Sequence, residues 1–243
     1  MNFSRAELKY AAKERVRTAK PHPMLVTLIY VLIPIVAYGL VAFITLGYSG
    51  LSLLFSAYFS GDQEALSAVL ASFLHGPAFL SGFLSILLAL FSVVLNAGFT
   101  WYGMSLARGQ ETGFGSIFEG FADVGRIIAA SILMGIFVFL WSLLFFFPGI
   151  IALYRYRMTY RILRDNPHVS ALQAISISKT MMRGYKMSLF VLDLSFLGWA
   201  ILSTLTLGIL GLWVSPYQSA TEANFYDAIQ GGFQPDAPPV WEP

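Results

Sequence analysis

The sequence contains no cysteine and only three histidines among its 243 residues. The absence of cysteine excludes disulfides, thiolate metal sites, iron–sulfur clusters and cysteine nucleophiles. The histidines, His22, His75 and His168, lie far apart in segments expected at the surface, and no HExxH spacing occurs. The sequence therefore predicts neither a metal site nor a cofactor. It contains no GxSxG motif, and the expected topology assembles no Ser/His/Asp triad, so we expect no enzymatic activity.

Charged residues are scarce as well. Only 12% of the residues are charged, whereas 57% are hydrophobic. A soluble domain is usually about a quarter charged, so this chain cannot cover a water-facing surface and most of its surface must face lipid. The net charge of +2 is too small to indicate nucleic-acid binding. The composition therefore predicts an integral membrane protein without a separate soluble domain.

The segment at residues 3–19 is predicted to form an amphipathic helix. Ser4 and Glu7 have the spacing of a capping box. Apolar residues recur at helical spacing on one face: Leu8, Ala11, Ala12 and Val16. Basic residues are expected to attract anionic lipid headgroups: Arg5, Lys9, Lys13, Arg15, Arg17 and Lys20. The helix would lie on the cytoplasmic leaflet, either as an anchor that fixes the topology or as a surface for a partner protein.

The remaining chain predicts an all-α fold: a polytopic helical membrane protein with about six transmembrane helices plus the N-terminal amphipathic helix. The expected spans are residues 24–46, 78–107, 127–147, 150–163, 187–202 and 209–226. Residues 1–23 form the basic helix, residues 24–230 the membrane domain, and residues 231–243 a Pro/Gly-rich tail that we expect to be disordered.

Two segments leave alternatives open. Residues 48–77 contain no lysine or arginine, with a turn expected at Ser60-Gly61-Asp62 and an amphipathic helix after it. They could lie at the outer interface or form a re-entrant hairpin. Residues 150–163 are short for a span and carry three arginines, so full crossing is uncertain from the pattern, but the parity of the other spans requires a return here.

The connecting segments carry local signals. Phenylalanines in residues 108–126 indicate a small interfacial helix capped near Ser116. Pro148-Gly149 is expected to end the third span. Asn166-Pro167 has the pattern of a helix start, as N-cap and first residue, and this helix should stop at Gly184.

The distribution of basic residues predicts the orientation. All 15 lysines and arginines fall on segments expected in the cytoplasm or on the helix that returns there. This agrees with the positive-inside rule. We therefore expect a multi-pass protein of the cell membrane with both termini in the cytoplasm, associated with the lipid bilayer and able to bind a membrane-protein partner or a second copy of itself.

Several stretches resemble a known bacterial family. These are ELKYAAKERV at residues 7–16, PGIIALYRYRMTYRILRDNP at 148–167, SKTMMRGYKMSLFVLDLSFLGW at 178–199, TLTLGILGLWVSPY at 204–217 and the FY pair at 225–226. In them the chain resembles the integral membrane proteins of the domain-of-unknown-function family DUF975. The resemblance implies a multi-span membrane protein and no particular activity. The family pattern mostly has uncharged residues where Arg155 and Arg157 stand, so a role built on these arginines would belong to this chain.

Five polar residues within or near the apolar spans form the candidate site: Arg155, Arg157, Asp193, Glu222 and Asn96. Charged groups at mid-bilayer cost roughly 2.5–3.5 kcal/mol, so they should face the bundle interior or find partners. Similar depths predict a contact between Asp193 and Arg157, with Arg155 as the second choice. Asp193 could instead accept a hydrogen bond from Ser195, Asn96 or a backbone amide, and Glu222 could extend to the headgroups.

This polar set has two interpretations, and they lead to two function classes. It is either a clasp that holds helices together or a site for transport or lipid headgroups. The first class is a non-enzymatic accessory or scaffold protein that binds lipid or a partner and assists transport or export. The second is a small transporter or permease-like protein. A solid bundle would favour the scaffold, whereas a cavity lined by Asp193, Arg157 and Asn96 would favour the transporter.

Overall fold

A computed structural model describes residues 4–60, 63–144 and 146–231, without the side chains of residues 46, 48–60, 63–80, 144 and 146. These residues are helical or in turns, and they contain no strand. The chain divides into two compact units: residues 31–92 form unit 2, and the remainder forms unit 1. The all-α class is confirmed. The predicted tail at residues 232–243 and the Gly61-Asp62 turn lie outside the described residues.

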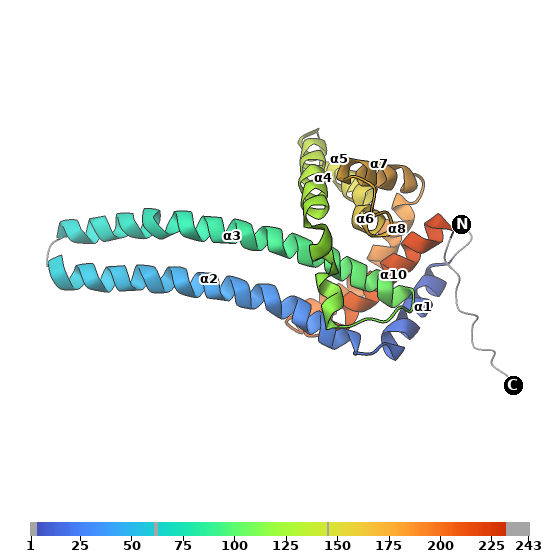
Figure 1. Cartoon of the computed structure of the whole chain (residues 1–243), viewed down its shortest axis with the longest axis horizontal. Helices are drawn as coiled ribbons and strands as arrows, with labels where there is room; N and C mark the ends of the chain where they lie inside the picture. Colours follow the sequence, from blue (N-terminus) through green and yellow to red (C-terminus); the bar gives the residue numbers. More distant parts are fainter. Residues whose placement is uncertain (1–3, 61–62, 145, 232–243) are drawn as a thin grey trace. The chain divides into compact units, whose positions relative to one another are not determined.

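Two long helices run through both units (Figure 1). They are α2 (Pro23–Ser60) and α3 (Gln63–Ala107), of 38 and 45 residues. At 1.5 Å per residue α2 is about 57 Å long, well beyond a hydrocarbon core of about 30 Å. The separate helix expected within residues 48–77 is therefore wrong, because residues 48–60 and 63–77 continue the two long helices. Their placement at the outer interface or in a re-entrant hairpin stays a prediction. Isolated glycines such as Gly47 do not end a helix by themselves.

Helix α1 (Arg5–Thr18) begins with the predicted capping box. The Glu7 amide donates to Ser4 Oγ at 3.1 Å, and the Ser4 amide donates to Glu7 Oε2 at 2.9 Å. Leu8, Ala12 and Val16 are buried, as the helical spacing indicated. They face protein, because α1 packs against α10 (Gly211–Gln230) and the Asn224 side chain donates to the Leu8 carbonyl at 3.0 Å.

The interfacial helix expected before α4 is a 3-10 helix, η1 (Phe114–Asp123). The Gly113 amide donates to Ser116 Oγ, so Ser116 takes part in the start of the helix, close to where capping was expected. Gly98 of α3 allows close approach here, because a Cβ at this position would clash with the Ile117 carbonyl. This close approach allows η1 to pack directly against α3.

The hairpin after η1 consists of α4 (Val124–Leu144) and α5 (Phe146–Tyr156), which pack against each other. The predicted break at Pro148-Gly149 is displaced. Pro148 stands in the first turn of α5, where its missing amide leaves no hydrogen bond unmade. Gly149 lies against the Ser142 side chain, which leaves no space for a Cβ.

The segment expected to be one span at residues 150–163 is broken. It consists of the end of α5 and of α6 (Thr159–Asp165). The Ser178 hydroxyl bridges the break, since it donates to the Arg155 carbonyl at 3.0 Å and accepts from the Met158 amide at 3.3 Å. Ser178 belongs to α7 (Ala171–Met181), so a side chain from another helix satisfies the backbone groups that the break frees.

The helix start predicted at Asn166-Pro167 is wrong. Asn166 caps the C-terminus of α6, and its side-chain amide donates to the Ile162 carbonyl at 3.0 Å. Helix α7 begins four residues later with Ser170 as N-cap and Gln173 completing a capping box. Gly184, with φ of +81°, lies in the turn after α7, as predicted.

The fifth expected span is also two helices, α8 (Lys186–Leu194) and α9 (Leu197–Leu205). At the break, the Phe196 amide donates to the Asp193 carbonyl at 2.9 Å, and Phe196 packs its ring edge against Tyr217 of α10. Helix α10 continues to Gln230, four residues beyond the predicted end of the sixth span.

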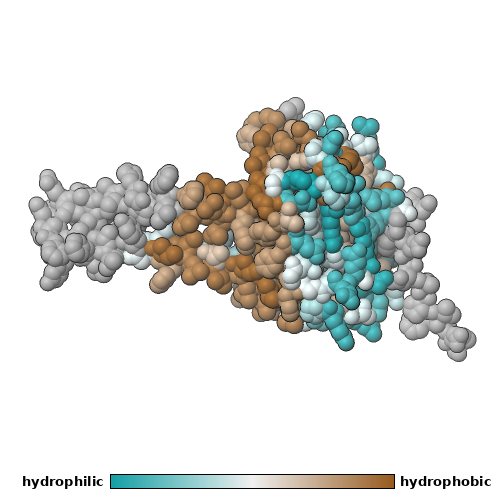
Figure 2. Space-filling model, viewed as in Figure 1, coloured by the Kyte–Doolittle hydropathy of each residue, from teal (hydrophilic) through white to brown (hydrophobic). Residues whose placement is uncertain are grey.

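Four segments of the described chain are long and apolar enough to cross a membrane: Pro23–Thr45, Ser81–Ala107, Phe114–Leu143 and Lys186–Leu205. They match the first, second, third and fifth expected spans. The expected fourth and sixth spans are not among them, because the fourth is broken and rich in arginine and the sixth carries Glu222 and Asn224. Figure 2 shows hydrophobic residues over α4, whose outer face includes Leu140, at 50% exposed.

Candidate functional site

A cavity of about 930 Å³ lies in unit 1 among α2, α3, α4, α5, α6 and α10. Helix α4 lines it with one continuous face: Ser131, Met134, Gly135, Val138, Phe139 and Ser142. Helix α10 contributes a second face at helical spacing: Ser215, Gln218, Ser219 and Glu222. Its size falls within the range of small-molecule sites, which are usually concave and mostly apolar with a few polar groups.

Two arginines and one glutamate form an ion triad at this cavity. Arg157 donates from Nη2 to Glu222 Oε1 at 2.8 Å and from Nε to Oε2 at 3.2 Å. Arg161 donates from Nη2 to Glu222 Oε2 at 3.2 Å. The side chains of Arg161 and Glu222 are 4% and 8% exposed, whereas that of Arg157 is 45% exposed. Glu222 is therefore buried between two cations and does not extend to the headgroups.

Asp193 has a different partner from the one predicted. The Tyr154 hydroxyl donates to Asp193 Oδ2 at 3.1 Å, while Asp193 Oδ1 is buried without a hydrogen-bond partner among the described residues. The predicted Asp193–Arg157 contact is wrong, because Glu222 occupies both donor positions on one edge of the Arg157 guanidinium. Tyr154 also lines the cavity, so Asp193 is linked to it through one side chain.

The other two predicted site residues separate. Asn96 lines the cavity, and its amide donates to the Tyr30 hydroxyl at 3.1 Å. Arg155 lies away from the triad, with its guanidinium 5.3 Å from the centroid of the Trp141 ring, a cation–π contact. Of the five predicted residues, the cavity therefore brings together Arg157, Glu222 and Asn96.

The site predicted from the sequence did not include Arg161. The spacing of four residues between Arg157 and Arg161 was the available signal, since such residues neighbour each other on a helix. The chain turns at Arg157, yet the guanidinium groups of Arg157 and Arg161 both contact Glu222. The four-residue spacing therefore indicated two neighbouring side chains even across the break between α5 and α6.

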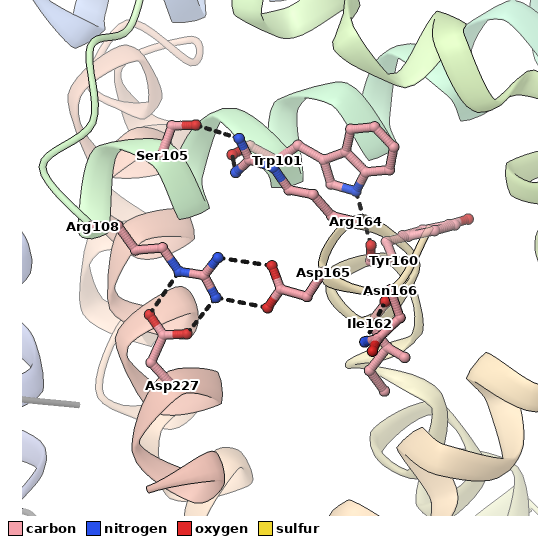
Figure 3. Close-up of polar contacts among 9 residues, drawn as sticks. All are labelled: Trp101, Ser105, Arg108, Tyr160, Ile162, Arg164, Asp165, Asn166 and Asp227. Carbon is pink, nitrogen blue, oxygen red and sulfur yellow. Dashed lines mark hydrogen bonds and ion pairs between the residues drawn. The ribbon is translucent and has the colours of Figure 1, made fainter. Parts of the chain in front are cut away.

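A second arginine cluster joins the ends of three helices (Figure 3). Arg108 donates to both oxygens of Asp165, at 2.8 and 2.7 Å, and to both oxygens of Asp227, at 3.2 and 2.7 Å. The hydrogen bonds that Arg108 donates to Asp165 and Asp227 raise the pKa of Arg108, so its charge is permanent. This contact joins the C-terminal ends of α3, α6 and α10.

Arg164 extends the same cluster. It donates to the Trp101 carbonyl and the Ser105 hydroxyl, and to Glu119 Oε2 at 3.2 Å. The Trp101 indole in turn donates to the Tyr160 carbonyl at 2.8 Å (Figure 3). Through these contacts the cluster fixes α6 against α3.

Arg126 anchors the start of α4 to the end of α6. Its guanidinium donates to the Asn166 carbonyl at 2.7 Å and to the Val169 carbonyl at 2.8 Å. An arginine at a helix C-terminus satisfies carbonyls that have no partner within the helix. Arg126 therefore holds the end of α6 beside the start of α4.

The basic residues of α1 divide into two groups. Arg5, Lys13, Arg17 and Lys20 are exposed. Lys9 instead donates to the Ser195 carbonyl at 3.3 Å and lies 4.3 Å from the Phe196 ring centroid. Burial, together with the nearby Arg5, lowers the pKa of Lys9.

Among the described residues, no group of three histidine, aspartate or glutamate side chains could hold a metal ion. The side chain of His75 lies outside the described residues, and His22 accepts a hydrogen bond from the Met24 amide.

Comparison with known families addresses the C-terminal part of the chain. Residues 146–232 match the family model described as protein of unknown function (DUF975). The resemblance noted in the sequence is thereby confirmed over this segment. No curated protein and no solved structure matches the chain.

The DUF975 segment runs from α5 to the end of α10 and contains the whole ion triad, together with Tyr154 and Asp193. Asn96 and the α4 face of the cavity come from outside it. The charged wall of the cavity is therefore built by the DUF975 segment, and the apolar wall by the preceding helices.

Proposed function

We propose that this protein is a non-enzymatic membrane accessory protein that binds a lipid-like ligand in the cavity of unit 1 and thereby assists transport or export. The observation that carries the proposal is a cavity of about 930 Å³ with an ion triad on one wall and apolar residues such as Val138 and Phe139 on another. A pure scaffold has no need of such a space, since helix bundles close-pack their interiors.

The test fills the cavity without disturbing the fold. Gly135 lines the cavity, and a Cβ added there meets no atom within 4 Å. Gly135→Phe should therefore occupy the space and remove co-purifying lipid, measured by native mass spectrometry of gently purified protein. Gly125→Phe is the matched control, because Gly125 lies on the same helix with equal room but does not line the cavity. Equal lipid occupancy in both variants would refute the proposal.

A small transporter is the second candidate. It is favoured by Arg157, Glu222 and Asn96 lining one space, since polar groups in a membrane often mark a substrate path. An exchange assay in proteoliposomes that contain fluorescent phosphatidylglycerol distinguishes a transporter from an accessory protein. A transporter would speed exchange of this lipid between leaflets above that of empty liposomes, and Glu222→Gln would abolish the gain, whereas an accessory protein would leave the rate unchanged.

The exposed basic residues of α1 fit a contact with anionic headgroups. Arg5, Lys13, Arg17 and Lys20 are available for this, at about 1 kcal/mol per residue near a charged surface. Lys9 is engaged with Ser195 and contributes less. Binding of a peptide of residues 4–20 to vesicles rich in phosphatidylglycerol, weakened by salt, would support this role.

We further infer that six segments cross the membrane with both termini in the cytoplasm. Support comes from Arg108, which joins the ends of α3, α6 and α10, and from Arg126, which joins the start of α4 to the end of α6. Helix ends that meet at one level fit an alternation of crossings.

A further inference from the structure

We propose that Arg157 is the residue that recognises the ligand, and that the ligand is an amphipathic molecule with one anionic group, such as an anionic phospholipid. This rests on the proposed ligand-binding function and names the chemistry of the same cavity.

The charge of the triad is the first argument. Arg157 and Arg161 carry two positive charges, and Glu222 carries one negative charge between them. The triad itself therefore carries one more positive than negative charge. Asp193 is close enough to act electrostatically on both arginines, but it makes no hydrogen bond to either, since its hydrogen bond comes from Tyr154. An anionic group at Arg157 would instead pair with the guanidinium directly, through charge-assisted hydrogen bonds.

The donor geometry identifies which arginine is available. Arg157 uses Nε and Nη2 on Glu222, and its Nη1 has no hydrogen-bond partner in the described part of the chain. Its side chain is 45% exposed and lines the cavity. Arg161 is 4% exposed, with Nη2 on Glu222 and Nη1 on the Met158 sulfur. Arg157 therefore presents a free donor edge, while Arg161 holds Glu222 in position.

The apolar wall indicates the other half of the ligand. The α4 face of the cavity runs from Ser131 to Ser142, about 16 Å at 1.5 Å per residue. Ser131 at one end pairs with the Tyr160 hydroxyl at 2.7 Å, and the middle is formed by Met134, Val138 and Phe139. A stripe of this length and character suits an acyl chain whose headgroup lies at the arginine end.

The experiment compares ligands that differ in one property. Purified full-length protein in neutral detergent is titrated with dioctanoyl phosphatidylglycerol, with dioctanoyl phosphatidylcholine of equal chain length, and with inorganic phosphate, which has no chain. Native mass spectrometry counts the bound lipid molecules. The binding of phosphate is measured by its ability to displace phosphatidylglycerol. We expect one phosphatidylglycerol per protein, at least tenfold tighter than phosphatidylcholine, because charge-assisted bonds to guanidinium are strong. Phosphate that competes as well as phosphatidylglycerol would overturn an amphipathic ligand.

Variants then test the residue. Arg157→Gln should weaken the binding of phosphatidylglycerol to the level of phosphatidylcholine binding. Arg157→Lys should keep part of the preference for phosphatidylglycerol, because lysine retains the charge but not the planar guanidinium. Arg155→Gln is the matched control, since Arg155 lies over Trp141 outside the cavity. In the Arg157 variants Glu222 retains its ion pair with Arg161, so its buried carboxylate stays paired.

The outcomes separate the two levels of the proposal. If Gly135→Phe leaves both lipids bound, the cavity is not the ligand site and the proposed function fails. If Gly135→Phe blocks binding but both Arg157 variants keep the full preference for phosphatidylglycerol, the role of Arg157 alone is overturned.

Discussion

At the scale of single residues, Glu222 holds the densest charge contacts of the cavity. It accepts from Arg157 and Arg161, and the Gln218 side chain donates to it at 3.4 Å. Because Arg161 and Glu222 are both almost fully buried, removing the carboxylate would leave a buried guanidinium without a counter-charge. The site thus depends on a pairing that spans α6 and α10.

We predict that Glu222→Gln lowers the free energy of unfolding by about 3–5 kcal/mol, the usual effect of breaking a buried ion pair. Chemical unfolding in mixed micelles measures it. Asp193→Asn is the comparison, because Tyr154 can donate to an amide oxygen as it does to the carboxylate. An effect of Asp193→Asn as large as that of Glu222→Gln would show that the two carboxylates were assigned the wrong roles.

Arg108 permits a second prediction at this scale. Arg108→Gln leaves the carboxylates of Asp165 and Asp227 facing each other without a cation. These side chains are 22% and 15% exposed, so solvent screens part of the loss and we expect a decrease in stability of about 2–3 kcal/mol. Adding Asp227→Asn should restore part of it. Arg183→Gln, at an exposed position, should change stability by less than about 0.5 kcal/mol.

At the scale of elements, the short helices depend on side chains that other helices supply. The break between α5 and α6 exposes the Arg155 carbonyl and the Met158 amide, and the Ser178 hydroxyl satisfies both. The turn before α7 is fixed in the same way, because Arg126 of α4 binds the Val169 carbonyl. Local sequence patterns therefore do not show where these helices break, because the groups that stabilise each break come from another helix.

We predict that Ser178→Ala destabilises the protein by about 1–3 kcal/mol, since it leaves two buried backbone groups without a partner. Hydrogen exchange at the Met158 amide should increase selectively. Ser176→Ala, on the exposed face of the same helix, should alter neither measurement. Unchanged exchange at Met158 in the Ser178 variant would mean that the break is stabilised by other contacts.

The same comparison explains which element predictions failed. The capping box of Ser4 and Glu7 was correct because both partners lie within one turn. Asn166-Pro167 was wrong because the Asn166 side chain bonds backward to Ile162 and caps the preceding helix. An asparagine can do either, and its sequence neighbours do not distinguish the two outcomes.

At the scale of the whole molecule, the ends of α3, α6 and α10 meet at Arg108, and the start of α4 meets the end of α6 at Arg126. These contacts tie segments 40 to 119 residues apart in sequence. They show that helix ends from distant parts of the chain meet at two arginines.

We predict that single cysteines at Lys13 and Lys179 are labelled from one side of the membrane and a cysteine at Leu207 from the other. The chain has no cysteine, so each label reports one position. Leu207 is 94% exposed in the turn between α9 and α10, and Lys13 and Lys179 are also exposed. Labels on Lys13 and Lys179 from opposite sides would exclude a topology with both on the polar level.

The amino-acid sequence by itself determined that the chain is helical, apolar and built for a membrane, because composition and the lengths of uncharged runs depend on no distant contact. It also identified Arg157, Glu222 and Asn96 as polar groups that need an interior position. Only the tertiary structure decided the pairing: Glu222, and not Asp193, lies between the two arginines, and Ser178 bridges the break beside them. The physical reason is that each ion pair and each bridging hydrogen bond joins helices far apart in the chain, where spacing along the sequence carries no information about which side chains meet.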